Sequence, residues 1–134
     1  MTEVSLARLY VLRAAYLIVV VGLGLTIWPR LIAHDASWPL MNSAVAALLG
    51  GVSILALIGL RYPLKMLPIL LFEFVWKSIW LVAVALPLWR ADAVDAAARQ
   101  TVIDCLFGVV LVLIVMPWGY AFNQYVRAPG ERWR

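Results

Sequence analysis

The chain has 134 residues, of which 66% are hydrophobic and 13% are charged, and its mean hydropathy is +0.97. Soluble domains are about 45–50% apolar and about 25% charged, so a single small core could not bury this much apolar surface in water. The composition therefore excludes an ordinary soluble domain and predicts one domain that uses a bilayer as its solvent.

Charge and the rare residue types exclude further classes. The formal net charge is +4, but the basic residues cluster beside apolar segments, which favours a membrane protein over a nucleic-acid-binding protein. The single cysteine, Cys105, excludes an internal disulfide framework. The single histidine, His34, excludes a site that needs two imidazoles from one chain, such as a haem held by two histidines.

Four segments are apolar enough to cross a membrane: 10–32, 40–60, 66–89 and 101–122. A span needs about 20 mainly apolar residues, and a helix satisfies its own backbone hydrogen bonds in lipid. We therefore predict an all-α integral membrane protein, a compact four-transmembrane-helix bundle that forms one domain over residues 1–134. The first segment follows Arg8 and Arg13 as a signal peptide would, but we expect it to be retained as a helix.

The distribution of basic residues predicts the orientation. Seven Lys or Arg residues precede the first segment, join the second to the third, or follow the fourth, whereas three lie on the other side. The positive-inside rule then places both termini in the cytoplasm, most simply in a bacterial-type inner membrane. The polar loop 90–100 faces outward, and the basic tail 123–134 lies on the cytoplasmic side. His34 and Asp35 would form an exposed outer loop, with pH sensing as the alternative.

Acidic residues near the outer loop predict helix starts. Asp92 and Asp95 favour a helix N-terminus, so the fourth helix is expected to begin near residue 92. Asp104 follows Thr101 by three residues, a spacing typical of a capping box. We interpret Asp104 as a cap or surface residue, or alternatively as the lining of an outer vestibule.

Small residues repeat along the second segment and predict close helix packing. Ser43, Ala47 and Gly51 recur every four residues, and Ala46 with Gly50 forms a parallel row. Such a face lets two helices approach closely. We expect it to pack within the chain, against Gly22 and Thr26 of the first segment, with homodimerisation as the alternative.

The third segment carries two opposite charges near its centre. Glu73 and Lys77 are four residues apart, which is about 6 Å along a helix and the favourable order for a helical ion pair. Two central charges cost roughly 5–7 kcal/mol on insertion scales, about what the apolar residues of this segment return. We therefore expect this face, with Trp76 and Trp80, to point into the bundle, where Trp80 can contact the ammonium group.

Two interpretations of the pair stay open. It is either a self-neutralised structural pair that fixes the register of the bundle, or an intramembrane site for a proton, ion or polar substrate, to which Asp104 would contribute. The first interpretation predicts a small accessory or scaffold subunit that acts by helix association, in a homodimer or a larger membrane complex. The second predicts a proton-coupled small transporter or ion pathway.

Other chemistry has little support in the sequence. We find no phosphate-binding glycine loop, no metal-ligand cluster and no nucleophile with an adjacent histidine. We therefore expect no metal and no cofactor, and we do not expect an enzyme. An enzyme that acts on lipid through Glu73, Lys77 or Asp104 is the least favoured of the three functions.

Overall fold

The computed structural model describes residues 4–33 and 37–132, and this part of the chain contains helices and no strands. The elements are α1 (Leu6–Thr26), α2 (Trp28–Ala33), α3 (Leu40–Gly59), α4 (Leu67–Trp80), the π-helical turn η1 (Leu81–Ala85), α5 (Leu86–Arg90), α6 (Ala96–Val115), α7 (Trp118–Phe122) and the π-helical turn η2 (Asn123–Arg127). Four helical stretches are long and apolar enough to cross a membrane: Leu6–Ala33, Leu40–Gly59, Leu67–Arg90 and Ala96–Val115. The expectation of four long apolar helices is confirmed.

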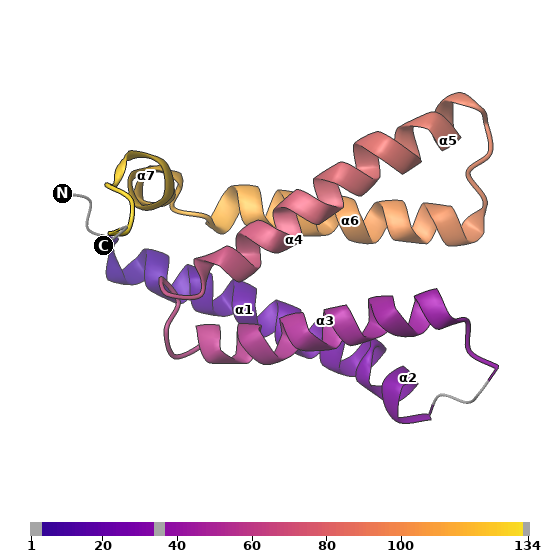
Figure 1. Ribbon diagram of the computed structural model, residues 1–134, viewed down its shortest axis with the longest axis horizontal. Coiled ribbons are helices and arrows are strands. Elements are labelled where there is room, and N and C mark those ends of the chain that lie inside the picture. Colours follow the sequence, from indigo (N-terminus) through magenta and orange to yellow (C-terminus); the bar gives the residue numbers. More distant parts are fainter. Residues whose placement is uncertain (1–3, 34–36, 133–134) are drawn as a thin grey trace.

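The helices are arranged as two pairs. Helix α1 packs along α3, and α4 packs along α6. The start of α1, the end of η2 and the turn between α3 and α4 lie at one end of the molecule, here called the termini end (Figure 1). The α5–α6 loop lies at the opposite end, here called the far end. The two pairs spread apart toward the far end.

The shared core lies near the termini end, where all four long helices contribute buried side chains. Leu12 and Tyr16 come from the first half of α1, Ala56 from the last turn of α3, and Leu67 from the first residue of α4. The remaining members are Ala15, Leu70, Val112, Val115, Met116 and Ala121. In water, burying one large apolar side chain stabilises a fold by about 1.5–3 kcal/mol. In lipid, the attraction comes instead from close van der Waals contact between the helices. The pairs are therefore joined most firmly at this end.

Helix α6 ends at Val115, earlier than the expected boundary at 122, because of Pro117. Proline has no backbone N–H, so the carbonyl of Leu113 loses its helical donor. The indole N–H of Trp118 donates to that oxygen over 3.1 Å. The Arg8 guanidinium of α1 donates to the next two carbonyls, those of Ile114 and Val115, over 3.0 and 3.2 Å. Side chains thus replace the backbone donors that the break removes.

Helix α1 also holds the turn that follows α3. The last carbonyls of α3 accept from backbone N–H groups of that turn, for example Leu57 from Leu60 and Ile58 from Tyr62. Arg13 Nε donates to the carbonyl oxygen of Leu60 over 2.9 Å, and the Tyr16 hydroxyl donates to that of Pro63 over 2.7 Å. An unsatisfied carbonyl is costly in an apolar medium, so three polar side chains of α1, including Arg8, satisfy carbonyls at the end of α6 and in the α3–α4 turn.

The remaining helix starts follow local chemistry. Asp95 is the N-cap of α6, and its carboxylate accepts from the Ala98 N–H over 2.8 Å, so the helix begins at Ala96 rather than near 92. Asp92 instead adopts a left-handed conformation, with φ of 52°, in the turn that leaves α5. Pro68 lies in the first turn of α4, where a missing N–H costs nothing.

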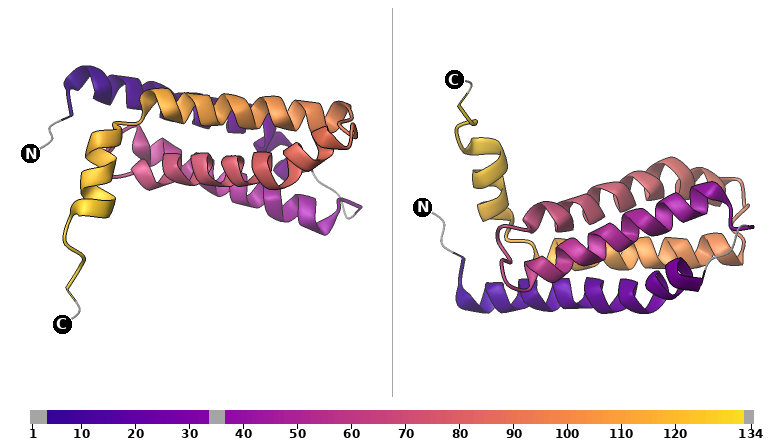
Figure 2. Two further views of the ribbon diagram at one scale, coloured as in Figure 1. Left: turned by 90° about the horizontal axis from the view of Figure 1, so that it is seen from above. Right: turned by 60° about the horizontal axis from the view of Figure 1, so that its bottom comes forward.

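The C-terminal segment leaves the bundle after Pro117. Helix α7 and η2 follow a direction different from that of α6 and project at the termini end (Figure 2). The Trp118 ring stays against the bundle, with its centroid 5.6 Å from that of Phe74 in an edge-to-face contact.

The two small-residue rows of α3 have different surroundings. Ala46 and Gly50 are buried, and a Cβ on Gly50 would lie 3.2 Å from Leu31 and 3.6 Å from the Trp28 ring. The Trp28 indole also donates to Ser53 Oγ over 2.9 Å. In the other row, Ser43 is half-buried and Ala47 and Gly51 are exposed.

Helix α1 does not meet α3 through the expected residues. Gly22 and Thr26 are exposed, and no atom lies within 4 Å of a Cβ placed on Gly22. The close approach occurs instead between Gly59 and Tyr16, where a Cβ on Gly59 would lie 2.6 Å from the ring. The contact between α1 and α3 is therefore made by the large buried ring of Tyr16 on α1, and not by small residues of α1 as predicted.

We expect Gly59→Ala to destabilise the protein and Gly51→Ala to leave it as stable or more stable. The first change forces a Cβ into the buried Tyr16 ring, which typically costs about 1–3 kcal/mol. The second adds a methyl group to an open site of the same helix and improves helix propensity. Thermal unfolding of both variants in one detergent measures the difference, and equal effects would refute this packing.

Candidate functional site

The opposite charges of α4 contact each other within one helical turn. Lys77 Nζ lies 3.1 Å from Glu73 Oε1. The Trp76 indole donates to the second carboxylate oxygen, Glu73 Oε2, over 2.5 Å. Because the three residues have i, i+3 and i+4 spacing, one straight helix is sufficient to bring them together. Both oxygens of the carboxylate are therefore occupied by side chains of its own helix.

The pair is withdrawn from the surface. The Glu73 side chain is 5% exposed and the Lys77 side chain 16%. The ammonium also lies 5.6 Å from the centroid of the Trp76 ring, within the range of a cation–π contact. Among the residues that the structure describes, no buried side-chain nitrogen or oxygen lacks a hydrogen-bond partner. The cost of removing the two charges from water is thus offset by contacts that satisfy them.

Helix α6 supplies the surface on which Lys77 lies, and Gly108 makes this possible. Gly108 is buried, and a Cβ there would lie 2.7 Å from Lys77 Cδ and closer still to Nζ. Cys105, one turn earlier on α6, is also buried and is a free thiol. Since any side chain at position 108 would displace the lysine, the ion pair also fixes how α4 and α6 pack.

The other residues predicted for this site lie elsewhere. Trp80 is half-buried, but the described contacts give the ring position beside the ammonium to Trp76 instead. His34 and Asp35 lie outside the described residues.

Asp104 is exposed on α6 and does not contact Glu73 or Lys77. Its carboxylate accepts from Gln100 Nε2 over 3.0 Å. It is not a capping residue, because α6 begins at Ala96 and the Thr101 hydroxyl donates to the Ala97 carbonyl. Asp104 precedes Gly108 by four residues, however, and so lies on the same side of α6, one turn toward the far end.

Gly108 is the residue that the sequence reasoning missed. A lone glycine in an apolar helix predicts only a close approach, and it does not say which residue approaches. Once α4 and α6 are known to be neighbours, the glycine at position 108 can be matched to Lys77. The long lysine side chain needs space, and a residue without a side chain on the facing helix provides it.

The chemistry available to this arrangement is narrow. The described residues contain no group of three or more His, Cys, Asp or Glu side chains that could hold a metal ion. Two hollows of about 700 and 360 Å³ are lined by residues other than Glu73 and Lys77. The contacts of the pair neutralise its own charges and fix the register of α4 against α6.

No family model, curated protein or solved structure matches this chain. The candidate site is therefore interpreted from its own geometry.

We expect Lys77→Met to lower the free energy of unfolding by about 3–5 kcal/mol, because it leaves Glu73 buried without its cation. The double variant Glu73→Gln with Lys77→Met removes both charges and keeps an acceptor for Trp76, so most of that loss should be restored. Unfolding in detergent or nanodiscs measures both variants and completes the cycle with Glu73→Gln. Additive effects would mean that the two side chains do not interact.

Proposed function

We propose that the chain is a small polytopic membrane protein that acts by association, as an accessory or scaffold subunit of a larger membrane assembly. The observation that carries the proposal is the closed contact of Glu73 with Lys77 and Trp76. An intramembrane charge pair that satisfies itself and is seated against a neighbouring helix serves packing rather than exchange with a substrate.

The exposed surface also supports association. Large apolar side chains on every long helix are exposed, such as Leu25, Leu48, Ile79 and Ile114. Lipid covers such residues, and so can the helices of another membrane protein. With short connections and no large extramembrane domain in the described chain, lateral contact is the main way in which this molecule can meet a partner.

We further propose that both termini face the cytoplasm in a bacterial-type inner membrane. The basic residues Arg8, Arg13, Arg61, Lys65 and Arg127 belong to segments at the termini end, which is the side that the positive-inside rule assigns to the cytoplasm. The acids of the α5–α6 connection, Asp92 and Asp95, then face outward.

A second candidate, a proton or ion pathway through Glu73 and Lys77, is favoured by one observation. Gln100 and Asp104 form a polar step on the side of α6 that carries Gly108, where Lys77 lies. Asp104 lies one helical turn from Gly108, toward the far end, so its carboxylate would continue a proton path between the pair and that end.

The two candidates predict different behaviour of purified protein. If the chain acts by association and the pair serves packing between α4 and α6, the chain should be isolated from its native membrane in a fixed ratio with a second membrane protein. The Glu73→Gln, Lys77→Met double variant should then retain that partner, because it keeps the fold. Native mass measurement in mild detergent gives the ratio, and proteoliposomes with an internal pH dye should show no proton flux above empty liposomes.

A different result would contradict the association proposal. A chain that is purified alone, and that carries a proton flux which Glu73→Gln abolishes while the protein stays folded, would replace the association proposal with the pathway. Asp104→Asn should then slow the same flux, and Asp92→Asn, which lies in the connecting turn, should not.

Orientation can be tested by labelling because the native thiol of Cys105 is buried. Ala93 and Ala128 are exposed at opposite ends of the molecule. With a membrane-impermeant maleimide, Ala93→Cys should be labelled in intact cells and Ala128→Cys only after the cells are permeabilised. The reverse pattern would invert the proposed orientation.

A further inference from the structure

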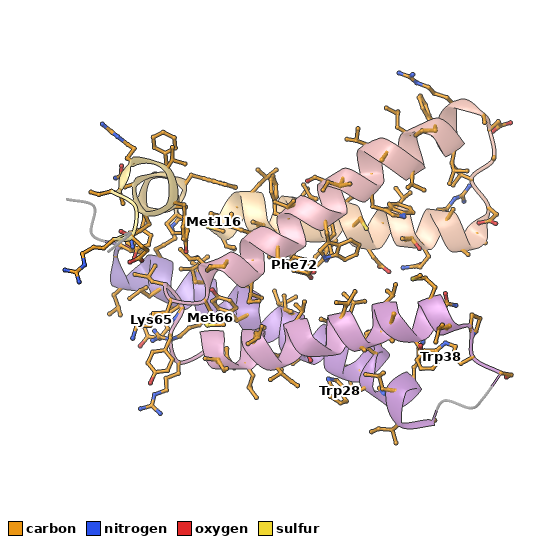
Figure 3. All side chains as sticks on the ribbon, viewed as in Figure 1. Trp28, Trp38, Lys65, Met66, Phe72 and Met116 are labelled. Atoms are coloured by element: carbon orange, nitrogen blue, oxygen red, sulfur yellow. The ribbon has the colours of Figure 1, made fainter. Side chains whose placement is uncertain are left out.

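An apolar groove runs along the outside of α3 and α4. Its volume is about 700 Å³, and its lining residues include Ala44, Ala47, Gly51 and Leu55 of α3 with Ile69 and Phe72 of α4. The α3 wall alternates small residues with the larger side chains of Leu48, Val52 and Leu55. In Figure 3, Phe72 lies along α4 and Lys65 lies at the termini end, in the turn before this helix.

Two cations without a carboxylate partner lie in the turn between α3 and α4. Arg61 and Lys65 are exposed, and both approach the ring of Tyr62, at 5.4 and 5.1 Å from its centroid. Within the described part of the chain, neither of them forms a salt bridge. Tyrosine with basic neighbours is typical of the level at which lipid headgroups meet hydrocarbon.

The cations stand at one end of the groove. Lys65 precedes Ile69 of the groove by four residues, and the N–H of Met66 bonds to the Tyr62 carbonyl in the turn before α4. On the other side, Tyr62 follows Leu55 by seven residues, and its N–H bonds to the Ile58 carbonyl. The turn 60–66 joins the end of α3 to the start of α4, so both walls of the groove lead to the same basic turn.

The length of the groove suits a lipid chain better than a helix. Ala44 and Leu55 are eleven residues apart on α3, which is about 16 Å at the helical rise. This is close to one leaflet, half of the roughly 30 Å hydrocarbon thickness, whereas a partner helix would follow the whole span.

We propose that the groove holds an acyl chain of an anionic phospholipid, whose phosphate binds Arg61 and Lys65. The groove has almost no polar surface to recognise anything but hydrocarbon, and the two unpaired cations supply the preference for negative charge. The proposal requires that the four helices lie in a bilayer. It does not require a protein partner, so it can fail or hold independently of the proposed association.

The test measures which lipids stay with the isolated full chain. Purified protein is equilibrated with mixed micelles that contain equal amounts of phosphatidylglycerol and phosphatidylcholine with identical chains, and retained lipids are counted by native mass spectrometry. The wild type should retain phosphatidylglycerol preferentially. Replacing both cations, Arg61→Gln with Lys65→Gln, should lower that preference by about tenfold. The two residues are expected to attract the anionic headgroup about equally, so removing both removes the electrostatic preference. The charge-retaining pair Arg61→Lys with Lys65→Arg should keep it.

The groove itself is tested by filling it. Gly51→Leu adds a side chain to an open position of the lining, so it should reduce retention of both lipids without changing their ratio. Matched controls are Arg90→Gln with Arg99→Gln at the far end and Gly22→Leu on the open side of α1, and both should behave as the wild type. Thermal unfolding shows that each variant is folded.

Three outcomes would overturn the proposal. Equal retention of the two lipids by the wild type would remove the anionic preference. An unchanged preference in the doubly neutralised variant would place the headgroup elsewhere. A Gly51→Leu variant that keeps its lipids but loses an oligomer would mean that the groove receives a helix instead.

Discussion

In an apolar surrounding every polar group must find its partner inside the protein, and the architecture of this chain depends on how that demand is met. The critical groups are the carbonyls at the end of α6, where Pro117 removes a backbone donor, and carbonyls of the turn after α3. Arg8, Arg13 and Tyr16 of α1 donate to these groups. Helix α1 thus connects the α3–α4 turn with the end of α6, and the shared core lies at the same end of the molecule.

The charged pair obeys the same demand by another route. Glu73 finds both of its partners, Lys77 and Trp76, on its own helix, and α6 contributes only space through Gly108. A charge that is neutralised locally places no requirement on the identity of its neighbours, only on their shape. This explains how ionised groups persist in a helix whose apolar residues barely compensate for them.

Sequence reasoning was sufficient wherever one residue type or one helix decides the outcome. The four long apolar helices follow from the length of each apolar run, and the proximity of Glu73 to Lys77 follows from their spacing. It failed where neighbours compete for the same role. Asp92 and Asp95 both suit a helix start, yet only Asp95 has the extended backbone of an N-cap. The early end of α6 required treating Pro117 as a break, which is only one of its common roles in membrane helices.

Because Glu73, Trp76 and Lys77 are neighbours on α4, their contact does not depend on any other helix. The contact forms as soon as this stretch becomes helical, before α6 has been translated. A helix built in this way would enter a bilayer with its net charge already cancelled. If the two charges were divided between α4 and α6, the charge on α4 would have no partner until α6 had been synthesised and had packed against it.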